Sequence, residues 1–128
     1  VTVTAAGGQT AAFVVSAKAP AALDEELDCD IEPQGGQDMV LSWTPAGDGS
    51  SIRWEMIAVY HAGNGPMVIC EVDESQGLLT VPASVIDAYL PHRTPAETFQ
   101  LTRFQRGQVD LESGGSFWLE LASMRACW

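Results

Sequence analysis

The stretch MVLSWTPAGDGSSIRWEMIAVY, residues 39–60, is the most informative segment for the fold class of this 128-residue chain. Two apolar runs, each with one tryptophan, flank the turn-forming residues TPAGDGS. Apolar and polar residues alternate in both runs, as they do in a strand with one face against a core. Pro45 ends the first run, because proline cannot donate to a ladder of backbone hydrogen bonds. The stretch therefore predicts two strands joined by a turn.

The same period of two recurs along the chain and predicts an all-β fold. The expected strands are 13–17, 39–44, 52–60, 68–72, 78–82, 99–104 and 117–121. The segment PASVIDAYLP breaks the period with apolar residues at helical spacing between two prolines, which predicts a short crossover helix. Gly-rich stretches at 61–66 and 106–115 read as turns.

The short connections favour antiparallel pairing, so the predicted architecture is a two-sheet β-sandwich of about seven strands. Residues 1–128 form a single domain in this interpretation, with a long acidic connection at 18–38.

The charge balance argues against two classes of partner. Six basic residues face 17 acidic ones, a net charge of −11, which repels phosphate backbones and anionic lipid head groups. The apolar stretches are far shorter than the roughly 20 residues of a membrane helix, so membrane insertion is not expected. The opening VTVTAAGGQT lacks an initiator methionine, and we expect a processed or excised piece of an exported protein.

The stretch VLSWTPAGDGSSIRWEMIAVY resembles the second-to-third-strand region of fibronectin type III-like domains. The resemblance covers roughly residues 39–122 and implies that Trp43 is the core tryptophan between the sheets. Phe99, in TFQLTRFQ, stands where the family usually has tyrosine, so the corner hydrogen bond of that hydroxyl is missing. The order of VIC, an acidic turn, GLLTVP and a short helix is similar to Ig-like domains of bacterial lipoproteins and surface proteins.

This resemblance implies a binding, spacer or adhesive module in an extracellular, cell-surface or periplasmic location, without catalytic residues or a cofactor. We therefore expect a non-catalytic binding or scaffolding module. One alternative is a carbohydrate- or calcium-binding accessory module of a secreted enzyme. Another is a structural subunit of a fibre or shell, in which VTVTAAGGQTAAFVV pairs with a neighbour by strand addition.

Three cysteines bear on the compartment. Cys70 shares a strand face with Val68 and Val72, so we expect a core thiol. Cys29 and Cys127 occupy no core position, and a bridge between them would close a loop of about 100 residues, worth about 4 kcal/mol. The alternative is three reduced thiols in an intracellular protein.

The run DEELDCDIE supplies weak calcium candidates, Asp28, Asp30 and Glu32. Placed in the first ligand positions of an EF-hand loop, they put Pro33 where glycine is required and Met39 where the bidentate glutamate belongs. A solvated acidic loop is therefore the preferred interpretation.

Catalytic motifs are lacking in the sequence, whereas an interaction surface can be proposed. There is no G-x-S-x-G elbow, and the two histidines, His61 and His92, fall in loops, so no enzyme is expected. Trp118 falls on the strand face of Glu120, toward solvent, and with Trp128 it could bind a protein or glycan partner. The alternative is that Trp118 packs under the 18–38 connection. The sequence leaves the oligomeric state open.

Overall fold

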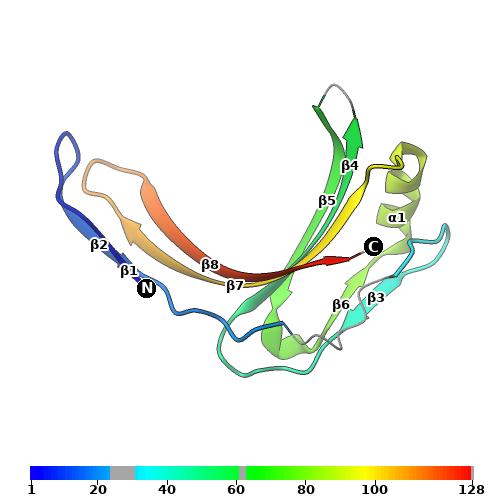
Figure 1. Ribbon diagram of the computed structural model, residues 1–128, viewed down its shortest axis with the longest axis horizontal. Helices are drawn as coiled ribbons and strands as arrows, with labels where there is room; N and C mark the ends of the chain where they lie inside the picture. The colour runs from blue at the N-terminus through cyan, green and yellow to red at the C-terminus, as the bar shows by residue number, and fades with distance from the viewer. Residues whose placement is uncertain (24–30, 61–62, 128) are drawn as a thin grey trace.

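A computed structural model describes residues 1–23, 31–60 and 63–127, and Figure 1 shows their arrangement. The secondary structure of these residues is mostly strand, with one α-helix, α1 (Ala83–Tyr89), and two 3-10 turns, η1 (Glu74–Gln76) and η2 (Leu90–His92). The strands are β1 (Thr2–Ala5), β2 (Phe13–Ser16), β3 (Met39–Ser42), β4 (Ser51–Tyr60), β5 (Gly63–Asp73), β6 (Leu78–Val81), β7 (Thr98–Asp110) and β8 (Ser116–Cys127). The strand pairs are antiparallel. The predicted all-β class with one short helix is confirmed.

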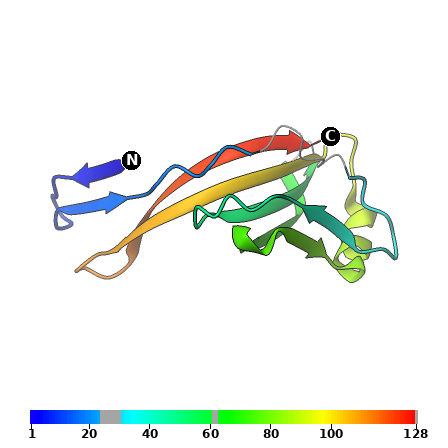
Figure 2. The same cartoon turned by 90° about the horizontal axis from the view of Figure 1, so that it is seen from below.

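A curved four-stranded sheet, in the order β5-β4-β7-β8, organises the molecule. Two further pairs, β1-β2 and β3-β6, lie on its convex side, β1-β2 under one end and β3-β6 with α1 under the other (Figures 1 and 2). No described strand or helix lies on the concave side. The sheet therefore has one covered and one open face.

The core fills the convex side next to β3 and β6. Alternate residues of β4 are buried, and they form one cluster with buried side chains of β3, β6, β7 and α1. Trp54 is fully buried in this cluster, whereas Trp43 is only half-buried. The expectation that Trp43 is the core tryptophan is therefore wrong. Strand β3 ends at Ser42, which leaves Trp43 at the rim, where its Nε1 donates to the Glu74 carbonyl at 2.7 Å.

Strands β7 and β8 are longer than the sequence predicted. The expected turn over residues 106–115 shrinks to five residues between Asp110 and Ser116, where the Leu111 N–H donates to the Gly115 carbonyl at 3.0 Å. Residues of β7 beyond Phe104 lack apolar alternation, because their convex side faces the thin β1-β2 hairpin instead of the main core. The missing alternation hid this half of the strand.

The N-terminal hairpin β1-β2 packs against the far half of β7, residues 105–110, through a close backbone contact. A Cβ atom on Gly107 would lie 1.9 Å from the Ser16 carbonyl oxygen, so only glycine fits there. Val15 of β2 is buried, and the ring of Phe13 of β2 lies 4.9 Å from the ring of Phe117 of β8. Strand β1, which the period did not predict, pairs with β2 inside the chain.

The helix prediction for PASVIDAYLP is confirmed. Helix α1 begins after Pro82, and its apolar residues Ile86 and Tyr89 are buried against the core. Among the described residues, no helix has the length and apolar character needed to cross a membrane.

Candidate functional site

The concave face of the four-stranded sheet is the candidate functional site. Strand pairing places odd-numbered residues of β4 and, from Met67 on, of β5 on this face, together with even-numbered residues of β7 and β8. The even-numbered residues from Ser116 to Ala126 are all exposed, whereas their odd-numbered neighbours from Leu119 to Arg125 are half-buried. On this face exposure is therefore greatest on the edge strand β8, whereas Thr102 and Phe104 of β7 are buried.

Four charged side chains form a closed cluster at the middle of this face, here called the arginine–glutamate cluster. Arg53 of β4 pairs with Glu71 of β5 at 2.6 Å and with Glu120 of β8 at 2.8 Å. Arg106 of β7 pairs with the same two carboxylates, at 3.1 Å and 2.8 Å. Each charge therefore has two partners of opposite sign, and the cluster is neutral.

Phe104 lies beneath the two guanidinium groups. The Cζ atoms of Arg53 and Arg106 each lie 4.5 Å from the centroid of its ring, within the range of a cation–π contact. The ring is almost fully buried although it points to the open face. Phe104 thus packs between the sheet and the two guanidinium groups and supports the cluster.

The cluster stabilises the charged forms of its members. Hydrogen bonds from Arg53, followed by those from Arg106, lower the pKa of Glu120. Burial acts to raise the pKa of Glu71, but the hydrogen bonds from the two arginines outweigh it, and its pKa is lowered. Both carboxylates stay ionised and paired, so neither is suited to act as a general acid near neutral pH.

Large apolar side chains surround the cluster on the same face. Trp118 is 61% exposed and Met124 66% exposed on β8, and Met67 and Ile69 are about half exposed on β5. The Arg106 guanidinium lies 5.9 Å from the Trp118 ring. An ordered neutral polar centre with exposed apolar flanks is a composition typical of a binding surface rather than of a solvated sheet face.

The sequence predicted one part of this face. Trp118 is exposed on the face of Glu120, and no described segment covers it. Trp128 lies outside the described residues. The arginine–glutamate cluster was missed because its members come from four strands, and only the register of the sheet brings them together.

A second ion pair is buried on the convex side, between Arg103 and Glu74. The Arg103 Nη2 lies 3.2 Å from Glu74 Oε1, and both side chains are at most 6% exposed. Glu74 also accepts hydrogen bonds from the Ala46 and Gly47 N–H groups, and Arg103 Nη1 donates to the Ala22 carbonyl at 2.8 Å. This pair ties three connections to the sheet, which is a structural role.

Of the calcium candidates, Asp28 and Asp30 lie outside the described residues. Glu32 is exposed and pairs with Arg93 at 3.2 Å. In the described ranges, no group of three or more His, Cys, Asp or Glu side chains could hold a metal ion. Calcium binding stays a prediction.

Of the cysteines, Cys70 carries a free thiol, half-buried against the core, and burial raises its pKa. Cys127 is buried at the end of β8. Cys29 lies outside the described residues, so its bridge to Cys127 remains a prediction.

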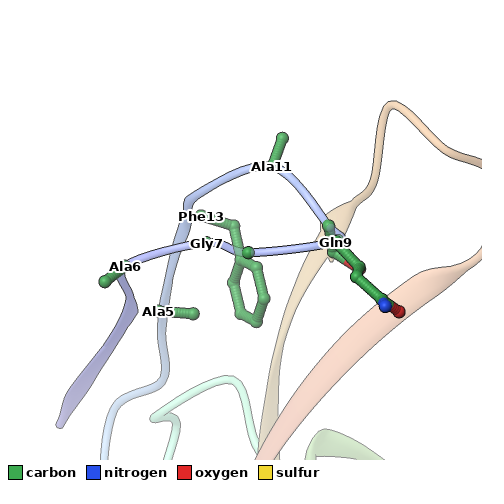
Figure 3. A pocket seen from close by; sticks show the side chains of 8 residues that line it. Ala5, Ala6, Gly7, Gln9, Ala11 and Phe13 are labelled. Carbon is green, nitrogen blue, oxygen red and sulfur yellow. The ribbon is translucent and has the colours of Figure 1, made fainter.

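The loop of the β1-β2 hairpin borders a shallow hollow of about 330 Å³ that is widely open to solvent (Figure 3). Its lining is made of Ala, Gly, Gln, Thr and Phe residues between Ala5 and Phe13, with no acid, histidine or cysteine. His92 is exposed at the end of η2, and His61 lies outside the described residues. Neither place offers a nucleophile next to a base in the part of the chain described.

Comparison with known proteins found no matching family model, and no significantly similar curated protein or solved structure.

Proposed function

We propose that this chain is a β-sandwich module of the fibronectin III-like or Ig-like type that binds a protein partner without catalysis. The concave face of the four-stranded sheet is the binding surface. The observation that carries the proposal is the open face itself, with its paired charges and exposed apolar flanks.

Strand order supports the sandwich assignment. In Ig-like domains the G, F and C strands share one sheet, to which C′ adds, while B and E lie in the other. Matching β3 to B gives β8-β7-β4-β5 as G-F-C-C′ and β3-β6 as B-E. The core cluster holds side chains from both sheets, as a sandwich requires.

The physical state of the concave face supports binding. The two arginines are held by bidentate or multiple hydrogen bonds, so little side-chain entropy remains to be lost when a partner docks on them. Trp and Arg are the residue types most often found as energetic centres of interfaces. Trp118 and Arg106 stand next to each other on this face.

The localisation that fits this module is outside the cytoplasm, on a cell surface or in a periplasm. The support is the acidic, lysine-poor surface and the predicted bridge between Cys29 and Cys127.

A peptide-library selection tests the binding surface. The protein is immobilised through Lys18, the only lysine in the sequence, and displayed random peptides are enriched on it. The affinities of the enriched peptides are then measured against I69A/W118A, which removes one apolar side chain on each flank of the cluster. The matched control is V40A/L78A, which removes two side chains of comparable exposure from the β3-β6 pair.

We expect the enriched peptides to lose at least about tenfold in affinity for I69A/W118A and to bind V40A/L78A unchanged. Peptides that bind I69A/W118A as tightly as the unmodified protein would refute the concave face as the binding surface. A selection that enriches no peptide would count against a protein partner.

Trp118 favours one second candidate, a glycan-binding module. Its exposed ring lies beside the guanidinium of Arg106, and sugar-binding sandwiches use such aromatic platforms next to planar polar groups. Affinity electrophoresis through gels that contain xylan or β-glucan tests this function. Retardation that is lost in W118A would support it, and mobility unchanged by either polysaccharide would exclude these two ligands.

A further inference from the structure

The outer edge of β8, with which no described strand pairs, differs from the other strand edges in the described part of the chain. Strands β1, β2, β3 and β6 have four residues each, and short edges recruit other strands poorly. Strand β5 contains Pro66 and pairs with β4 through a register shift, and both features interrupt an edge. Strand β8 has 12 residues, no proline, no lysine and an unbroken register with β7. Long open edges of this kind pair with other strands.

The hydrogen-bond pattern fixes which residues of β8 face outward. The Leu111 N–H bonds to the Gly115 carbonyl, so bonded pairs between β7 and β8 involve odd-numbered residues. On the far side of the sheet, the Glu74 N–H donates to the Ser50 carbonyl, so bonded pairs between β4 and β5 involve even-numbered residues. Because bonded and non-bonded positions alternate along each strand, odd-numbered residues of β4 then bond to β7, and odd-numbered residues of β7 bond to β8, in agreement with the Leu111 bond. The N–H and C=O groups of even-numbered residues of β8, from Trp118 to Ala126, therefore point away from the sheet.

The described residues that directly follow β2, up to Leu23, do not pair with this edge. The Leu23 N–H donates to the Ser123 hydroxyl, and the Arg103 side chain donates to the Ala22 carbonyl. Both contacts lie on the convex face, and among the described residues no backbone group outside β7 bonds to the backbone of β8.

We propose that a second copy of this chain pairs with β8 in antiparallel orientation, with Leu121 of both copies on the two-fold axis. Because only even-numbered residues offer outward groups, bonded pairs must join even to even. The axis is then perpendicular to the sheet, and the two concave faces open on the same side. This inference goes beyond the proposed function, which a single copy can perform.

Side-chain complementarity selects the register. With Leu121 on the axis, Trp118 lies opposite Met124 of the second copy, and the reverse pair forms by symmetry. These are the two most exposed large apolar side chains of β8, and aromatic–sulfur contacts are favourable. A shift of the axis to Glu120 would place like charges opposite each other, and a shift to Ala122 would leave Trp118 opposite Ala126.

Sedimentation velocity over the micromolar range tests the dimer. We expect a species of twice 13.7 kDa at the higher concentrations. M124K places a charge in the paired strands and A122P removes an outward N–H group, so each should weaken the dimer at least about tenfold. M67K adds the same charge to an exposed methionine of β5 on the same face, and it should leave the dimer intact.

A cysteine variant tests the register. Directly opposite Leu121 residues would form a non-hydrogen-bonded pair with Cα atoms about 4.5 Å apart, inside the disulfide range of roughly 4.4–6.8 Å. Mild oxidation should therefore link L121C into a covalent dimer, whereas L119C, opposite Ser123, should link no faster than the unmodified protein. Any of three results would overturn the proposal: a monomer at all concentrations, a dimer that M124K and A122P leave unchanged, or equal rates of disulfide linking for L119C and L121C. Selected peptides that still bind monomeric A122P, which keeps the apolar flanks of the concave face, would show that the binding function stands without the dimer.

Discussion

Two arginines on β7 allow a matched test of how the fold is held together. Arg103 and Arg106 are three residues apart, each pairs with glutamate, and they point to opposite faces of the sheet. The side chain of Arg103 is 6% exposed and that of Arg106 is 38% exposed. The same substitution, Arg to Met, keeps much of the aliphatic packing at both positions and removes the charge.

The expected costs differ severalfold. R103M leaves the Glu74 carboxylate buried without its charged partner, and breaking one side of a buried pair costs about 3–5 kcal/mol. R106M removes partners from two carboxylates that water can reach and that keep Arg53, so it should cost no more than about 1 kcal/mol. Since small domains have a total stability of about 5–15 kcal/mol, R103M should be severe but measurable.

Urea unfolding, followed by the tryptophan fluorescence to which fully buried Trp54 contributes, measures the free energy of unfolding of both variants. The double variant R103M/E74Q removes the orphaned charge and should recover part of the loss, with a coupling of about 0.5–3 kcal/mol. An R103M variant that loses less than about 1 kcal/mol, like R106M, would refute the argument that this pair ties the connections to the sheet.

Three further predictions follow from single contacts. G107A should detach the β1-β2 hairpin, because no Cβ fits against the β2 backbone. Amide hydrogen exchange should then become faster in the hairpin alone, and unchanged exchange would contradict the contact. Hydrogen bonds from Ser50 and from the Ala21 N–H lower the pKa of Asp48 to about 2 from an ordinary value of 3.8. The ionised carboxylate therefore stabilises the fold fully above pH 3.8, and this contribution is lost as the pH falls toward 2. In D48N, the free energy of unfolding should depend less on pH in that window. Alkylation after unfolding without reductant should modify one cysteine, Cys70, if Cys29 and Cys127 are bridged, and three modified cysteines would remove the bridge.

The sequence was most informative where strands face the core. Alternation predicted β4 because every second residue from Ile52 to Ala58 is buried, and the helical spacing of Ile86 and Tyr89 predicted α1 for the same reason. Trp118 followed from the same alternation, since it falls on the face opposite Leu119. In each case the spacing of apolar residues within one short segment reflects which side of that segment is buried.

What the sequence did not reveal depends on contacts between distant segments. The far half of β7 is covered by a hairpin of short strands, so Gly107 replaces the expected apolar residue and the segment resembles a turn. The pairing of Glu74 with Arg103 and the four members of the arginine–glutamate cluster depend on register across the sheet. Composition and local period carry no information on such pairs.

The four methionines directly test whether one face of the sheet is core and the other is open. Met67 and Met124 stand on the concave face at 51% and 66% exposure, whereas Met39 and Met56 are at most 4% exposed. Oxidation by dilute peroxide, followed by peptide mass spectrometry, gives a rate for each. We predict that Met67 is oxidised at least about ten times faster than Met39 and Met56, because buried side chains react only after local opening. Equal rates for Met67 and Met56 would contradict the open face and with it the proposed binding surface.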